Sequence, residues 1–471
     1  MEELTGAFAA SNNLYPRKPN VVVVLWADDS EPVYISNRAV SGLTATHQLT
    51  GVIDDLGTSS QEIKQSDFFA TIGTSDLKFY DTQGFLANQI KTREENGQGF
   101  SRSTVEVFFG LDDMVWSEYK QRRTYRVMGA SSNEGEITIH LADIQRDLED
   151  KTIFDPHIAN LAHTIEASAT FIPVVAKSAS QFPVLQRGAE YRDFPGQAWS
   201  VIQIEDEWII HSGLEDRPSE GGWGLAVLKR GAFGTTPKRH AFDPNQTSAD
   251  KQLEVTEKVF LEGPAVKLVY MLLSGVDLDE IVSLPEHWSA HLDARWIRLA
   301  DFVNLPEAIY DRPNREGIWA QIQGEEPVKV VDLLTKQFQP ILNCMQPVYA
   351  TGELGFKIRP VIVNGSAPDL ELGIDEIINV SDTQFVTEEI RNWWRFNWDY
   401  HAPTEKYRIS TFVQDSRASL DELRDLTEVN LRTVRNSKAT AVDMFEYMRG
   451  VLDRCASPII RKSVTLPPHF D

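Results

Sequence analysis

The sequence predicts a β-rich α+β protein of several domains: two barrel-like antiparallel β domains, an intervening mixed region and an inserted long helix. Two groups of short apolar or alternating runs predict the strands, one before residue 150 and one that begins at Trp199. A dense aromatic strand near residue 400 anchors the last part of the chain. With 471 residues, the chain has room for roughly three domains of about 150 residues each.

The expected domain boundaries follow from these groups and from the helical spacing between them. The expected parts are an arm over 1–20, a first barrel-like domain over 21–150, a connector and β-hairpin domain over 151–250, a mixed helical region over 251–345, and a second barrel-like domain over 346–471 with the inserted helix at about 417–456.

The first β domain is predicted by strands that follow one another closely. Val21–Trp26 is a continuous apolar run, typical of a fully buried strand, and Thr104–Phe109 alternates. Further strands are expected at Val33–Ser36, His47–Ile53, Glu62–Lys64, Phe68–Ile72, Leu77–Tyr80, Thr124–Met128 and Glu136–Leu141. Such a density of strands and turns favours an antiparallel barrel or sandwich over βαβ units. Phe85–Lys91 is the helical stretch of this domain.

The middle of the chain mixes both patterns. Ile158–Ala167 is expected to be a short helix, and three strands should follow at Trp199–Ile204, Glu207–His211 and Trp223–Arg230. A helix should start at Pro264 and end at Gly275, because proline suits a helix start and glycine its end. A second amphipathic helix is expected over Val328–Asn343, leading into a hairpin around Gly352.

The aromatic strand Asn392–Tyr400 places Trp394, Phe396, Trp398 and Tyr400 on one side. Aromatic side chains bury about 150–250 Å² each, which is enough to anchor a domain or an interface. The alternatives are a barrel core, a subunit interface and a sugar-binding platform, and the first two fit the alternation better. We therefore take Trp393, Trp394 and Trp398 as candidate interface residues, and expect Pro458–Leu466 to join the same sheet.

Charge and composition exclude several classes of protein. The formal net charge is −23, which disfavours binding to nucleic acid phosphates. The two cysteines, Cys344 and Cys455, are too few for a disulfide framework or a cysteine metal cluster. No apolar run is long enough to predict a membrane span, and the acidic N-terminus predicts no secretory signal.

No catalytic signature is present, so we expect neither enzyme activity nor a cofactor. His287 and His291 would share one face of a helix, with Asp293 close by, as part of a zinc site. The general-base glutamate between them and a specified third ligand are missing. We therefore expect no metal there, while a zinc hydrolase stays as an alternative.

A basic loop stands out on this acidic chain. Arg230–His240 contains Gly231 and Gly234, which allow positive φ, and the cations Arg230, Lys238 and Arg239. The functional interpretation is a contact with an acidic neighbour, including another copy of the chain. The alternative is an exposed loop without a partner. We take the three cations as candidate interface residues.

The same loop carries a resemblance. Arg230-Gly-Ala-Phe-Gly-Thr, preceded by Ile204-Glu-Asp-Glu-Trp-Ile-Ile210, resembles a segment of structural tail proteins of tailed bacteriophages. Tyr34-Ile35-Ser36, the turn at Ile72–Leu77, the helix and hairpin at Val328–Arg359 and the terminal strands resemble, in order, the tail hub (baseplate hub) proteins of long-tailed bacteriophages. The chain departs from many of them because it does not continue far beyond its last strand.

This resemblance implies a structural virion protein that closes the tail tube and adapts it to the tip or central fibre. It implies a homotrimer whose two barrel-like domains per chain continue a sixfold tube. The implied partners are the distal tail or tail tube protein, the tape-measure protein and the tip or fibre protein, with DNA only passing through the lumen. The protein would be made in the host cytoplasm and reside at the tail tip of the virion. The alternatives are a receptor-binding tail module, non-catalytic and specific for carbohydrate, and a distal tail adaptor protein.

Overall fold

The computed structural model describes most of the chain, and statements below concern those residues. They are 19–36, 38–43, 46–48, 74–175 without 82, 112 and 134, 182–186, 194, 196–244 without 221, 253–303 without 279–281, 318–338 without 325, 341, 344–345, 351–358 without 356, 379–380, 384–386, 390–415, 426–436, 444–452 without 446 and 450, 459–461 and 464–465.

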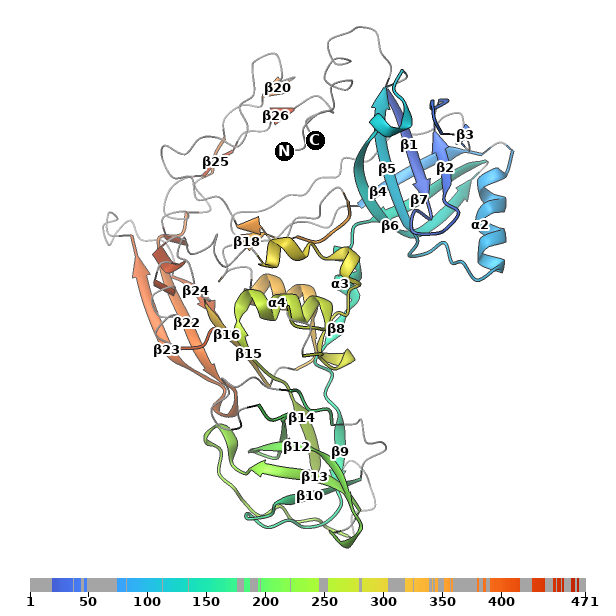
Figure 1. Ribbon diagram of the computed structural model, residues 1–471. Coiled ribbons are helices and arrows are strands. Elements are labelled where there is room, and N and C mark those ends of the chain that lie inside the picture. The colour runs from blue at the N-terminus through green and yellow to red at the C-terminus, as the bar shows by residue number, and fades with distance from the viewer. Residues whose placement is uncertain are drawn as a thin grey trace.

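A seven-stranded sheet forms the N-terminal part, in the order β3-β2-β1-β5-β6-β7-β4 (Figure 1). Its strands are β1 (Pro19–Leu25), β2 (Val33–Ser36), β3 (Thr46–Gln48), β4 (Thr74–Tyr80), β5 (Thr104–Leu111), β6 (Lys120–Asn133) and β7 (Glu136–Ala142). All neighbours are antiparallel except β2 and β3. The predicted strands in the described parts of 21–150 are confirmed. Among the described residues, however, the sheet is open at β3 and β4 rather than closed into a barrel.

Strand β1 is buried on both faces, which explains its continuous apolar sequence. Val23 and Leu25 pack in a cluster with Val107, whereas Val22 and Val24 pack in a second cluster with Met114 and Tyr119 on the other side.

The helix α2 (Phe85–Glu95) lies beside this sheet (Figure 1). The carboxylate of Asp81 accepts the Phe85 and Ala87 backbone N–H groups at 2.7 and 3.0 Å, so it satisfies two donors at the helix start. The helix α3 (Gln145–Asp150) follows the sheet. The helix α2 agrees with the helical stretch predicted at Phe85–Lys91.

A closed antiparallel barrel lies in the middle of the sequence, in the order β10-β13-β12-β11-β14-β9. Its strands are β9 (Ile158–Leu161), β10 (Phe171–Val175), β11 (Ser200–Ile204), β12 (Glu207–Arg217), β13 (Gly222–Lys229) and β14 (Glu254–Lys258). The three strands expected from Trp199 onward are confirmed. The helix expected at Ile158–Ala167 is wrong, because Ala159 and Leu161 alternate into the barrel core as part of β9.

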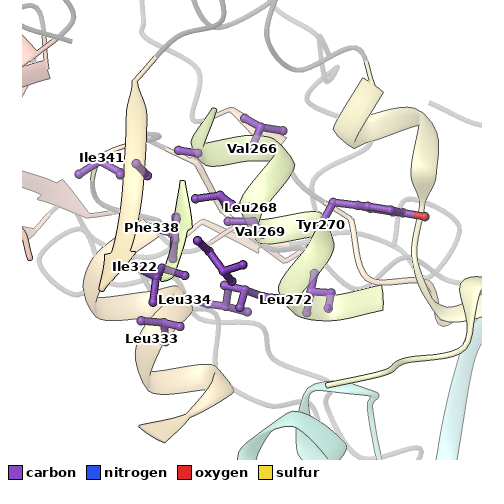
Figure 2. Packing of buried hydrophobic residues seen from close by; sticks show 14 of the residues in the cluster. Val266, Leu268, Val269, Tyr270, Leu272, Ile322, Leu333, Leu334, Phe338 and Ile341 are labelled. Carbon is purple, nitrogen blue, oxygen red and sulfur yellow. The ribbon is translucent and has the colours of Figure 1, made fainter. Parts of the chain in front are cut away.

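The central region is built on the helix α4 (Ala265–Ser274), which follows Pro264 and ends at the left-handed Gly275 as predicted. The antiparallel strands β15 (Phe260–Pro264) and β16 (Trp319–Gln323) flank it: β15 directly precedes the helix, and β16 comes later in the chain. A second helical segment begins at Val330, as α6 (Val330–Leu333) and a π-helical turn η7 (Leu334–Phe338). Figure 2 shows the packed side chains of α4 and these turns, among them Val269, Leu334 and Phe338.

The C-terminal part contains a three-stranded sheet in the order β23-β22-β24. The hairpin β22 (Trp393–His401) and β23 (Lys406–Gln414) was expected. The third strand is β24 (Thr427–Asn430), which pairs in parallel with β22. A continuous helix over 417–456 is therefore wrong: Thr427 and Val429 alternate in a strand, and helical residues occur at 444–445, 447–449 and 451–452.

The return strand is also corrected. β25 (Ile459–Arg461) pairs with β21 (Gln384–Val386), and β26 (Val464–Thr465) with β20 (Asn379–Val380), so neither joins the aromatic hairpin. The closed barrel is thus formed by residues 158–258 and not, within the described residues, by 346–471.

Two further short strand pairs are present. β8 (Thr152–Ile153) pairs with β17 (Val328–Lys329), and β18 (Cys344–Met345) with β19 (Lys357–Ile358). The second pair encloses Gly352, as predicted, but its first strand lies earlier than expected, at Cys344–Met345, and residues 346–350 lie outside the described residues. The arm over 1–18, the strands predicted within 49–73 and both cysteine side chains lie outside the described residues. Figure 1 shows the central region between the seven-stranded sheet and the closed barrel.

Candidate functional site

The Arg230–His240 loop is a folded corner at the end of β13. Gly231 has a φ of 59°, and a Cβ there would lie 2.5 Å from Pro237 Cδ, so the corner requires glycine. The Thr235 hydroxyl accepts the Trp208 N–H at 3.0 Å and donates to the Ala232 carbonyl at 2.8 Å. These contacts fasten the loop to β12.

Glu207, the first residue of β12, lies at the centre of this corner and is fully buried. Arg230 donates to both carboxylate oxygens, from Nε at 2.7 Å and from Nη2 at 2.8 Å. The backbone N–H groups of Gly231 and Lys238 donate at 3.0 and 3.2 Å, and His240 Nε2 lies at 2.8 Å. A bidentate, charge-assisted pair with these added donors compensates the removal of the carboxylate from water.

The electrostatics of the corner follow from these contacts. Burial alone would raise the pKa of Glu207, but the hydrogen bonds from Arg230, His240 and the Lys238 backbone outweigh it and hold that pKa below its usual range. The hydrogen bond from Lys238 lowers the pKa of Glu205, with a further contribution from His240. Both glutamates therefore remain charged at neutral pH.

The outer cations of the loop also bind acidic groups of this chain. Lys238 Nζ forms ion pairs with Glu205, at 3.0 Å, and with Asp206. Arg239 Nε lies 3.0 Å from a Glu166 oxygen. The acidic neighbours of the predicted basic spot are thus present within the chain itself.

The three cations differ in how far another subunit can reach them. The Arg230 side chain is 7% exposed, whereas those of Lys238 and Arg239 are 38% and 60% exposed. Arg230 is thus a structural residue of the corner. A role of Lys238 and Arg239 in a subunit contact stays a prediction.

The aromatic strand β22 directs one face into the protein. Phe396 and Trp398 are buried in the same cluster as α4, and Trp394 packs against that cluster. The Trp394 and Phe396 rings stack at 5.8 Å, and Tyr447 meets Phe396 edge to face. The predicted alternation of β22 is thus confirmed. The face that carries Trp394, Phe396 and Trp398 belongs to the core of the central region. Trp393 on the opposite face is half-buried.

The structure brings the two candidate regions together. His401, at the end of β22, donates from Nε2 to the Phe233 carbonyl in the basic loop at 2.8 Å. Tyr400 and Phe233 both pack against an apolar cluster that contains Trp208 and Ala402. The loop and the aromatic strand, which are distant in sequence, therefore meet at one joint beside the barrel.

The histidines considered for zinc do not form the expected pair. The turn at Glu286–Trp288 is a single 3₁₀ turn and Ser289 is extended, so His287 and His291 do not share a helical face. His287 lies instead against His157 and Glu257, a grouping with the chemistry of metal ligands. No local sequence signal points to His157 or Glu257, because they are far apart in the sequence: His157 directly precedes β9, and Glu257 lies on β14.

Comparison with known proteins finds distant structural likenesses, among them the following two. One is to the virion of a native gene transfer agent particle, with a TM-score of 0.25 and 10% identity over 54% of this chain and 84% of that chain. The other is to the 43 kDa tail protein of prophage MuSo2 from Shewanella oneidensis, with a TM-score of 0.32 and 12% identity over 96% of this chain and 78% of that one. At TM-scores this low, neither likeness bears on what this chain does. No family model and no curated protein matches the sequence.

Helices of the described residues fall short of a membrane span. None of them is both long and apolar enough to cross a bilayer.

Proposed function

We propose that this chain is a structural, non-enzymatic protein of a virion tail: the hub that closes the tail tube and adapts it to the tip or central fibre. The proposal rests chiefly on the Arg230–His240 segment, by which the chain resembles tail proteins. In the structure this segment is a hydrogen-bonded corner on a closed barrel, organised around Glu207. Tyr34-Ile35-Ser36, a second segment of the resemblance, lies on β2 of the seven-stranded sheet.

The architecture offers two large β units for such a role. The seven-stranded sheet over 19–142 and the closed barrel over 158–258 flank the central region. In a homotrimer, six such units would continue a sixfold tube. In a closed ring, one face of each subunit contacts a different face of its neighbour. In this proposal the seven-stranded sheet and the closed barrel carry these two faces.

The acidity of the chain suits a channel for DNA. A net charge of −23 repels phosphates, so a lumen lined by it would let DNA pass without holding it. The partners in this proposal are the tail tube or distal tail protein, the tape-measure protein and the tip or fibre protein, assembled in the host cytoplasm.

The solution mass of the full chain tests the proposal. Light scattering after gel filtration should give three times the 53.2 kDa chain mass for the chain alone, or three copies of the chain in its complex with tube protein. Arg239→Ala and Trp393→Ala should weaken the trimer, whereas Lys91→Ala on the exposed side of α2 should not. A monomer that never assembles with tube protein contradicts the hub role.

The carbohydrate-binding alternative gains no support from the tryptophans. Trp398 is buried and Trp394 stacks on Phe396, so neither offers a free ring face of the kind a sugar platform needs. Trp393→Ala should leave glycan-array binding unchanged.

A further inference from the structure

Three residues from separate segments meet at the junction of the barrel and the central region. His157 directly precedes β9, Glu257 lies on β14, and His287 is in the 3₁₀ turn η5 (Glu286–Trp288). Their ligand atoms all lie within 4.8 Å of one another. This places two imidazoles and one carboxylate around a single point.

The geometry around Glu257 is that of a shared ligand atom. Glu257 Oε2 lies 2.8 Å from His287 Nε2 and 3.6 Å from His157 Nδ1. The two imidazole rings face each other with centroids 4.2 Å apart and planes tilted by 33°. Zinc bonds of about 2.0–2.2 Å to nitrogen and oxygen separate tetrahedral ligands by roughly 3.4 Å, so small side-chain shifts suffice to admit an ion.

A second observation points to a ligand at this position. The Glu257 side chain is 1% exposed, and its Oε1 is buried without a hydrogen-bond partner among the described residues. A buried carboxylate oxygen without a donor is unfavourable unless a cation compensates it. The histidines are more open, at 38% exposure for His157 and 20% for His287, so an ion and a fourth ligand can enter.

The backbone holds the three residues in place. The Glu257 N–H donates to the His157 carbonyl at 2.9 Å, and the Phe154 N–H donates to the His287 carbonyl at 2.6 Å. The His157 N–H also donates to Glu257 Oε2 at 3.0 Å. The donor set is therefore fixed before any ion arrives, which favours binding.

We propose that His157, Glu257 and His287 bind one Zn²⁺ ion that clamps the barrel to the central region, with a water molecule as the fourth ligand. Two neutral imidazoles and a carboxylate suit zinc, which readily takes nitrogen and oxygen ligands in tetrahedral geometry. Because the ligands come from the residue before β9, from β14 and from η5, the ion joins segments that are far apart in the sequence. This inference is independent of the tail proposal.

Zinc binding by the full chain, stripped with a chelator and titrated against a chromophoric competitor, tests the site. We expect about one zinc per chain. His157→Ala and Glu257→Gln should weaken binding by at least about 100-fold, since even outer partners of metal ligands contribute 10–100-fold. His291→Ala is the matched control, because it removes the nearby histidine that the sequence pattern alone would select, and it should retain full binding.

A melting experiment keeps the test independent of variant stability. Added Zn²⁺ should raise the melting temperature of the unaltered chain in a dose-dependent manner, and excess chelator should reverse the rise. Co²⁺ should give the intense visible absorption of a tetrahedral site, and His157→Ala should lose it. Absence of zinc binding by the unaltered chain, or equal losses in His291→Ala and His157→Ala, overturns the site.

Discussion

At the scale of single residues, the corner around Glu207 contains a buried ion pair between Glu207 and Arg230. Both its carboxylate and the Arg230 guanidinium are removed from water, at 0% and 7% exposure. Such a pair adds little stability compared with apolar side chains, but either half alone is strongly unfavourable.

Glu207→Gln should therefore lower the free energy of unfolding by about 3–5 kcal/mol, because it leaves Arg230 buried without its counter-charge. Urea unfolding followed by tryptophan fluorescence measures this. Glu205→Gln is the matched control: Glu205 is 45% exposed, so its loss should cost no more than about 1 kcal/mol. Equal losses in the two variants would show that the corner is not held by the buried pair.

His211 on β12 gives the chain a pH dependence of known sign. Full burial lowers its pKa to about 3 from an ordinary value of 6.5. As the pH falls below 6.5, the unfolded chain takes up a proton that the folded chain refuses, so stability present above that pH is lost progressively down to about 3. The expected slope is up to about 1.4 kcal/mol per pH unit.

The comparison of the chain with His211→Gln isolates this slope. Between about pH 6.5 and 5, above the range in which glutamates titrate, the free energy of unfolding should fall less steeply in the variant. Parallel curves for the two proteins would mean that His211 is not the titrating group.

At the scale of elements, the barrel wall depends on a close approach at Gly224 in β13. A Cβ there would lie 2.4 Å from Phe171 Cζ and 2.6 Å from the Ile172 carbonyl oxygen of β10. Gly224→Ala should lower the free energy of unfolding by about 1–3 kcal/mol or more through this overpacking. Thermal unfolding measures this loss. Gly129→Ala in β6, where a Cβ meets nothing within 4 Å, should be close to neutral in the same measurement. A neutral Gly224→Ala would show that β10 and β13 can separate.

The sequence predicted elements well where the signal is local. The alternation in β22 and the turn after His401 sufficed for the hairpin with β23, because both lie in one short segment. The partner on the other edge, β24, was missed because Thr427–Asn430 also fits helical spacing with its neighbours. Its strand state is fixed by non-local contacts, such as the hydrogen bonds from Asn397 to Glu428 and Asn430.

The candidate metal ligands were missed for a similar reason. His157, Glu257 and His287 are brought together by the closure of the barrel and its junction with η5, which no local spacing encodes. The spacing of His287 and His291 pointed to a helix, but Pro285 precedes only one 3₁₀ turn. By contrast, the basic loop was recognised from its glycines and cations, although the sequence did not reveal that Glu207 lies beneath it.

At the scale of the whole molecule, three parts meet at one glycine. Gly324 follows β16 of the β15–β16 pair, has a φ of 62°, and donates its N–H to the Val259 carbonyl at 2.8 Å. A Cβ there would lie 2.6 Å from Trp208 of the barrel and 3.5 Å from Ala402 of the C-terminal part. We therefore expect this contact to help fix the position of the barrel relative to both other parts.

Gly324→Ala should therefore disturb the joint as well as the turn. The left-handed backbone costs any other residue about 1–2 kcal/mol, and displacing Trp208 should add about 1–3 kcal/mol. Gly135→Ala separates the two effects, because Gly135 has a φ of 87° but open space around it. Amide hydrogen exchange should accelerate near Trp208 and His401 in Gly324→Ala alone, since the His401–Phe233 hydrogen bond crosses the same joint. Identical exchange in both variants would mean that the barrel is not positioned by this contact.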